Sequence, residues 1–183
     1  MMKKRTLICV IILSMCSLCN TLPSFSQKRA ADLFHVPAAI FDPKNYFETV
    51  QYYNQELDSM PLSTAIDSSR KAAVYYLRGR SKFELTDKRG ALLDFDLAVS
   101  LDTANPAYYY YRGLAHHWLK HYPDAVENYD MAVKLKSDKM EYYLNRGYVK
   151  LLSDDTDGAC YDFSKAGELG LFKAYELIKE YCN

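Results

Sequence analysis

The sequence has few glycines and histidines and almost no tryptophan. Its 183 residues include seven glycines, four histidines and one tryptophan. The glycines fall where helix packing, turns and helix ends account for them, so none is left to form a phosphate-binding loop. A Gly-x-Ser-x-Gly nucleophile motif is absent as well. We therefore expect no enzymatic activity and no cofactor.

The sequence also lacks any concentration of charge of one sign. It has 23 basic and 23 acidic residues. If the leader discussed below is removed with Lys3, Lys4 and Arg5, 23 − 3 = 20 basic residues remain against 23 acidic ones, a net charge of −3. After residue 30 there is no block of lysine and arginine of the kind that follows a phosphate backbone. This pattern argues against a nucleic-acid partner.

Metal-binding motifs are scarce too. His117 and His121 stand four residues apart, a spacing that can place two imidazoles on one metal ion. The nearest acid is Asp124, and there is no His-Glu-x-x-His pattern. We expect structural histidines and no metal site. Carboxylates such as Asp94 and Asp96 are expected on solvated helix faces, where charge needs no further explanation.

The N-terminus has the three parts of a secretory signal peptide. Lys3, Lys4 and Arg5 precede an apolar run over residues 7–19, and a polar stretch follows that ends in Ser24-Phe25-Ser26-Gln27. The apolar run is shorter than the ~20 residues a spanning helix needs. We predict cleavage after Ser26, which gives a signal peptide over 1–26 and an exported protein of a bacterial periplasm or cell envelope, with no membrane insertion after cleavage.

Two alternatives for this segment stay open. One is an uncleaved N-terminal anchor. The other is a lipid anchor at Cys16 or Cys19, although the preceding Met15 and Leu18 are bulkier than the small residue that a lipoprotein signal prefers.

The remainder of the chain repeats with a period of 34 residues. The period recurs without an insertion in eight columns of residues. They are Tyr75/Tyr109/Tyr143, Arg78/Arg112/Arg146, Gly79/Gly113/Gly147, Ala91/Ala125/Ala159, Phe95/Tyr129/Phe163, Ala98/Ala132/Ala166, Leu101/Leu135/Leu169 and the lysine or histidine column Lys82/His116/Lys150. Such agreement indicates three copies of one structural unit.

Each unit reads as two amphipathic helices joined by a polar turn. In the first helix the glycine allows a neighbouring helix to approach closely. In the second, Ala91, Phe95 and Ala98 form a small–large–small stripe that fits between two helices. The turns are predicted at residues 86–90, 121–124 and 153–158.

These columns resemble the tetratricopeptide repeat, in which an aromatic residue is followed by Leu-Gly and later by Ala-x-x-x-aromatic and a second alanine. The resemblance covers three units, 72–105, 106–139 and 140–173. The sequence departs from the family pattern where arginine replaces the usual leucine, where Lys82, His116 and Lys150 replace a tyrosine, and where the closing proline is missing. The resemblance implies an all-α superhelix of three helix pairs.

Elements at both ends are expected to cover the superhelix. A C-terminal capping helix is predicted within 171–183, with Phe172, Tyr175 and Ile178 on its packing side. The segment 27–71 is predicted to hold one capping helix that starts at Asp42-Pro43 and ends before Pro61. Its apolar stripe is Phe47, Val50, Tyr53, Asn54 and Leu57. Residues 28–41 remain unassigned.

The resemblance implies a concave surface, lined mainly by the first helix of each unit, that holds a protein or peptide. Most of the 17 tyrosines are expected to fill helix contacts, and the rest to contribute to this surface. The predicted inner row is Tyr76, Arg80, Tyr110, Leu114, His117, Leu144, Tyr148 and Leu151. Its apolar character favours an extended or helical apolar segment over a free carboxylate. The alternative function is that of a structural subunit in a larger envelope complex or homo-oligomer, without a free groove.

Two cysteines follow the signal segment. Cys160 is near the start of the last second-type helix, and Cys182 is near the end of the capping helix. If consecutive helices are antiparallel, these two ends lie together, and an exported protein meets oxidising conditions. We predict a Cys160–Cys182 disulfide, with two buried thiols as the alternative.

Overall fold

The computed structural model describes residues 45–60 and 65–182, which belong to one compact unit spanning residues 37–183. The predicted signal peptide and residues 28–41 lie outside these ranges. The described ranges form helices only, as predicted. They are α3 (Tyr46–Ser59), α4 (Ala65–Glu84), α5 (Lys88–Leu101), α6 (Pro106–Trp118), α7 (Tyr122–Leu135), α8 (Met140–Leu151), α9 (Thr156–Glu168) and α10 (Lys173–Tyr181). None of these helices is long and apolar enough to cross a membrane.

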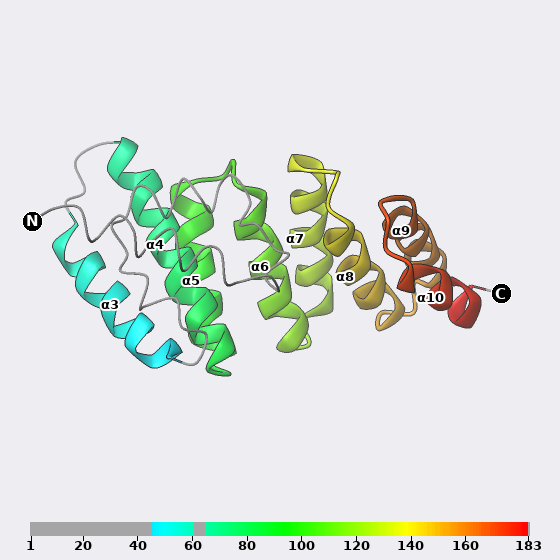
Figure 1. The fold of residues 1–183 in the computed structure, drawn as a ribbon, viewed down its shortest axis with the longest axis horizontal. Helices are drawn as coiled ribbons and strands as arrows, with labels where there is room; N and C mark the ends of the chain where they lie inside the picture. The colour runs from blue at the N-terminus through cyan, green and yellow to red at the C-terminus, as the bar shows by residue number, and fades with distance from the viewer. Residues whose placement is uncertain (1–44, 61–64, 183) are drawn as a thin grey trace, which may run out of the picture. The chain divides into compact units, whose positions relative to one another are not determined.

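Helices that follow one another in the chain pack side by side (Figure 1). The most extensive contacts are within the pairs α4/α5, α6/α7 and α8/α9, while α3 packs on α4 and α10 packs on α9. The helices α6 and α8 begin at the first residues of the second and third predicted units, Pro106 and Met140. In contrast, α4 begins seven residues before Ala72, where the repeat register places the start of the first unit. Residues 65–72 contain neither glycine nor proline, so nothing stops the helix from extending upstream.

The two helices of each pair are joined by the same turn. A residue with positive φ follows the end of the first helix, and the next residue donates its backbone N–H to a carbonyl five residues earlier. The residues with positive φ are Thr86 (66°), Lys120 (63°) and Asp154 (62°). The donor–acceptor pairs are Asp87 to Lys82, His121 to His116 and Asp155 to Lys150, each with an N···O distance of 2.9 Å. This Schellman geometry brings the side chains of the two bonded residues together.

The second helix of the outer two pairs starts with an aspartate cap. The Oδ1 atoms of Asp87 and Asp155 accept hydrogen bonds from the backbone N–H of Gly90 and Gly158. Both glycines therefore lie in the first turn of a helix and not in the connecting turns, which were predicted at 86–90 and 153–158. The side chain of His121, at the same position before α7, makes no capping hydrogen bond.

The glycine of each first helix lies against the aromatic ring of the second helix. A Cβ added to the glycine would meet a ring carbon at less than 3 Å. The pairs are Gly79 and Phe95 (2.8 Å), Gly113 and Tyr129 (2.9 Å), and Gly147 and Phe163 (2.7 Å). All three rings are fully buried. The predicted close approach of the helices at the glycine column is therefore confirmed.

Replacing Gly147 with alanine is expected to lower the free energy of unfolding by about 1–2 kcal/mol. Overpacking a well-filled core destabilises the folded state by about 1–3 kcal/mol. The higher helix propensity of alanine offsets at most about 1 kcal/mol of this loss. The matched control is Gly167→Ala in α9, because a Cβ there meets its nearest atom at an ordinary 3.6 Å. Urea denaturation followed by circular dichroism measures both. A loss in the control equal to that in Gly147→Ala would contradict the packing argument.

One carboxylate that was predicted to face solvent, Asp94, is a buried ion-pair partner. Asp94 accepts from Arg78 Nε at 2.9 Å and Nη2 at 2.5 Å, and it also pairs with Lys82 at 2.9 Å. The prediction of a solvated face for Asp94 is wrong, since only 1% of it is exposed. Its partners in the arginine and lysine columns lie in α4, across the helix contact, and a pattern within one helix does not reveal them.

The third unit repeats this arrangement. Asp162 accepts from Arg146 at 2.5 and 2.9 Å and pairs with Lys150 at 3.0 Å. In the second unit Asn128 takes the place of the aspartate and accepts from Arg112 Nε at 2.5 Å. The arginines that replace the leucine of the family pattern thus bind the two helices of each unit together.

Each arginine also contacts the element before its own unit. The contacts are Arg78 to Asn54 (2.9 Å), Arg112 to Asp96 (3.3 Å) and Arg146 to Asp130 (2.6 Å). The arginine column therefore joins successive units as well as the helices within a unit.

The end helices bury faces that differ in part from the predicted ones. In α3 the buried residues are Thr49, Tyr53 and Leu57, whereas Phe47 is exposed. In α10 they are Ala174 and Leu177, whereas Phe172 is 85% exposed and Tyr175 is exposed too. Phe172 precedes the first residue of α10, so it is not carried by the helix face that covers α9.

The two predicted cysteine partners come together where α9 begins and α10 ends. The Cα atoms of Cys160 and Cys182 are 5.8 Å apart, and their Sγ atoms are at bonding distance. This is the proximity that antiparallel helices predict.

Candidate functional site

The first part of the predicted inner row lies in an aromatic cluster between the first two units. The ring centroid of Tyr76 is 5.0 Å from that of Tyr108 and 5.3 Å from that of Tyr111. The guanidinium of Arg80 lies over the rings of Tyr76 and Tyr111, at 5.6 and 5.0 Å from their centroids. Tyr76 is only 6% exposed, so the prediction that it belongs to an open surface is wrong. The adjacent tyrosines of α6 cover it.

The middle of the predicted row is partly buried by the third unit. The ring of Tyr110 is 4.8 Å from that of Tyr142, and its hydroxyl accepts a hydrogen bond from Asn145 Nδ2 at 3.0 Å. Leu114 and Leu144 are partly buried against core clusters. Burial raises the pKa of Tyr76 and Tyr110, so both phenols stay protonated and uncharged at neutral pH.

The last part of the row opens into a hollow at one end of the third unit. Its volume is about 390 Å³. It is lined by His117 of α6, Tyr148 and Leu151 of α8, Leu152 just after α8, and Tyr181 at the end of α10. We name these five residues the α8 pocket. Three of them were predicted, so the structure brings part of the inner row together around one open site.

Sequence reasoning missed two residues of the α8 pocket, Leu152 and Tyr181. Leu152 follows the last residue of α8, and a helical projection that stops at Leu151 leaves it out. Tyr181 comes from the capping helix, whose end lies beside the start of α9. The predicted Cys160–Cys182 proximity was the signal that could have placed Tyr181 near this end of the third unit.

The walls of the α8 pocket are apolar and carry no charge at neutral pH. Tyr148 packs edge-on against the buried ring of Phe163, with a centroid distance of 5.5 Å, and this contact fixes its orientation. Burial lowers the pKa of His117, so its imidazole is neutral at pH 7. Leu152 is 52% exposed and Tyr181 44% exposed, which leaves both available for contact.

A second group of polar side chains lies at the turn between α6 and α7. The ring of His121 is 5.8 Å from that of His116, whereas the ring of His117 lies beside Tyr122 at 6.3 Å. The predicted i, i+4 pair, His117 with His121, is thus not the pair that the fold brings together. The helix ends before the positive φ of Lys120, so helical spacing does not extend to His121.

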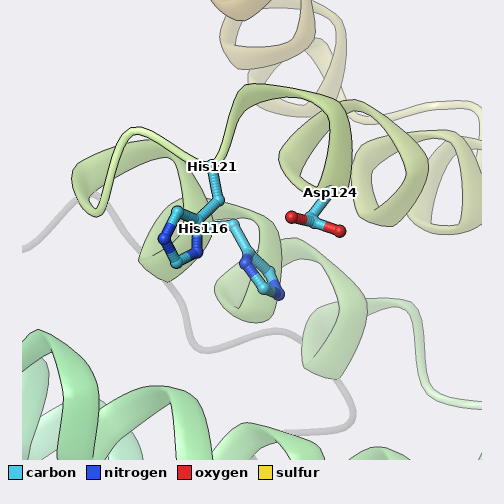
Figure 2. Close-up of side chains that lie close together, drawn as sticks. All are labelled: His116, His121 and Asp124. Atoms are coloured by element: carbon cyan, nitrogen blue, oxygen red, sulfur yellow. The ribbon is translucent and has the colours of Figure 1, made fainter.

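The third member of this group is Asp124. One ligand atom from each of His116, His121 and Asp124 lies within 4.8 Å of the others (Figure 2). We name these three residues the α6–α7 cluster. Burial lowers the pKa of His116, and the nearby Asp124 and Asp96 oppose this shift. The imidazole of His116 is therefore neutral at pH 7.

Comparison with known proteins assigns the fold. No protein-family model matches the sequence, and no curated protein matches it. Solved structures do match, and those of tetratricopeptide-repeat domains are among them. The chain has the tetratricopeptide-repeat fold, as the 34-residue columns predict.

Three of these structures illustrate the likeness. The first tetratricopeptide-repeat domain of Spaghetti (RPAP3) bound to the HSP90 peptide SRMEEVD has 23% sequence identity and a TM-score of 0.60, over 62% of this chain and 92% of that one. The Arabidopsis OM64 domain has 22% identity and a TM-score of 0.60, over 62% and 96%. MamA from Desulfovibrio magneticus RS-1 has 21% identity and a TM-score of 0.65, over 76% and 75%.

Proposed function

We propose that this protein is an exported, non-catalytic scaffold that binds a protein or peptide partner at the α8 pocket. The observation that carries the proposal is the convergence of His117, Tyr148 and Leu151 with two further side chains around one open apolar hollow. Open apolar hollows with exposed aromatic side chains are typical of partner-binding sites. The peptide complex of the RPAP3 domain supports a peptide-binding role for this fold.

The chemistry of the pocket favours an apolar segment as the ligand. Its lining consists of two tyrosines, two leucines and a histidine that is neutral at pH 7. A free carboxylate or an acidic side chain would lose its hydration there without gaining a cationic partner in the lining. We infer that a leucine-sized or aromatic side chain of the partner enters the hollow and contacts the tyrosine and leucine side chains that line it.

Introducing charge into the pocket is expected to weaken partner binding by at least about tenfold, since losing a central aromatic contact costs about 2 kcal/mol or more. The variant is Leu152→Glu combined with Tyr181→Glu. Both residues are exposed enough for glutamate to be tolerated in the folded chain. The full chain serves as bait in envelope extracts, captured proteins are quantified by mass spectrometry, and an apolar peptide from the captured partner is then titrated by fluorescence anisotropy.

The matched control is Leu93→Glu, because Leu93 is a 66% exposed leucine on α5, outside the pocket lining. The control should retain the partner that the pocket variant loses, with equal helicity in all three proteins. Equal capture by the pocket variant and the wild type would refute the pocket as the binding site. Capture of no protein other than a second copy of the chain would instead favour the structural-subunit alternative, which the exposed Phe172, just before α10, and the exposed Tyr175 of α10 support.

We also propose that the protein is exported to the periplasm or cell envelope of a bacterium. The proposal depends on the signal-like residues 1–26, and the proximity of Cys160 and Cys182 supports it. Structural disulfides persist in oxidising compartments and are rare in the cytosol. Cell fractionation with determination of the mature N-terminus tests the proposal, and an intact N-terminus in the cytosolic fraction would refute it.

A further inference from the structure

The middle unit differs from its neighbours at four positions that are adjacent in space. In the first and third units these positions hold lysine, a capping aspartate, glycine and a buried aspartate. The two sets are Lys82, Asp87, Gly90, Asp94 and Lys150, Asp155, Gly158, Asp162. In the middle unit they hold His116, His121, Asp124 and Asn128. The middle unit thus has His116 and Asn128 in place of the Lys–Asp ion pair, and His121 and Asp124 in place of the capping aspartate and the glycine.

The turn geometry forces the two imidazoles together. The backbone N–H of His121 donates to the carbonyl of His116 at 2.9 Å, in the Schellman geometry that the outer units share. Asp124 stands one turn further into α7, on the side that faces His116 (Figure 2). Asn128 occupies the position of the buried aspartate of the outer units. Its Nδ2 donates a hydrogen bond to the Asp124 carbonyl at 2.8 Å, which links Asn128 to the first turn of α7.

Helix stability does not account for these residues. The side chain of His121 makes no capping hydrogen bond, whereas Asp87 and Asp155 cap the equivalent helices. An aspartate, asparagine or serine at the cap would stabilise α7. In addition, His116 Nδ1 is a buried nitrogen without a hydrogen-bond partner. A buried polar atom without a hydrogen-bond partner destabilises the folded protein unless a ligand binds it.

We propose that the α6–α7 cluster, His116, His121 and Asp124, is a binding site for a divalent transition-metal ion of the Zn²⁺ class. Two imidazole nitrogens and one carboxylate oxygen are the donor set that Zn²⁺ takes in sites with three protein ligands and an open position. Bonds of about 2.0–2.2 Å to a tetrahedral ion require donor atoms roughly 3.5 Å apart. The donor atoms now lie within 4.8 Å, and His121 and Asp124 are exposed side chains that can turn inward.

The site is tested with Zn²⁺ alone, titrated into the purified full chain by calorimetry and in thermal melts. We expect His121→Ser to weaken the binding attributed to this site by at least about tenfold, because even the loss of an outer-shell partner costs 10- to 100-fold. Serine is also a good cap, so the metal-free variant should melt no lower than the metal-free wild type. It should lose the Zn²⁺-dependent rise in melting temperature that the wild type shows.

Two further variants make the result specific. His116→Gln should lose the same binding event, whereas His117→Gln should keep it, since His117 faces Tyr122 and the α8 pocket. Absence of Zn²⁺ binding in the full chain would overturn the proposal. Binding that is unchanged in both His121→Ser and His116→Gln would overturn it too, because that binding would belong to other residues such as the N-terminal cysteines.

Discussion

Replacing Asp162 with alanine is expected to lower the free energy of unfolding by about 3–5 kcal/mol, the usual cost of removing one partner from a buried ion pair. Asp162 is fully buried and neutralises two cations, Arg146 at 2.5 Å and Lys150 at 3.0 Å. Without it, Arg146 and Lys150, whose side chains are only 10% and 17% exposed, lose their buried counter-ion. Urea denaturation followed by circular dichroism gives the free energy of unfolding.

The matched control is Asp130→Ala, because Asp130 pairs with the same arginine at 2.6 Å but has a side chain that is 55% exposed. An exposed pair contributes at most about 1 kcal/mol, so this variant should be close to wild type. Equal losses in the two variants would show that burial does not decide the strength of these pairs. Asp162→Asn should fall between them, since Asn128 supports Arg112 in the same position of the middle unit.

Replacing Cys160 and Cys182 together with serine is expected to lower the free energy of unfolding by about 3 kcal/mol in oxidised protein. The cysteines are 22 residues apart in the chain, and a cross-link over a loop of this length restricts the unfolded chain by about that amount. The effect is measured by urea denaturation with and without dithiothreitol. The reductant should destabilise the wild type to the level of the double variant.

The control is the double variant itself, which the reductant should leave unchanged. Its α9–α10 contact would still be formed by Phe163 and Leu177, which belong to one core cluster. If mass spectrometry of the exported protein finds both cysteines as free thiols, the predicted disulfide is wrong, and the two residues are merely packed side by side.

The 34-residue columns predicted the fold because each column lies at a contact between neighbouring helices. Gly147 and Phe163 illustrate this: a small residue and a ring recur together because each requires the other at one helix crossing. Aspartate burial was not predictable in the same way. The residue pattern of α5 alone predicts that Asp94 faces solvent. Only the position of Arg78 and Lys82 in the neighbouring helix α4 explains its burial.

The candidate sites were less predictable than the fold. His117, Tyr148 and Leu151 were assigned to the inner row from helical geometry, and the structure places them around one hollow. Tyr76 was assigned by the same rule, yet the tyrosines of α6, the first helix of the following unit, cover it. The rule identifies the face of a helix, but it does not say how far the side chains of the following unit extend over that face.

The sequence by itself determined the helix pairs, their boundaries to within a few residues in most cases, and their order, because these depend on contacts that repeat at a fixed spacing. It also determined which cysteines could meet, since adjoining helix ends follow from a chain that reverses direction at each turn. Only the tertiary structure decided which carboxylates are buried, which part of the inner row is open and which histidines face one another. Those properties depend on side chains from different helices and on the backbone turn at Lys120, and no pattern within a single helix contains them.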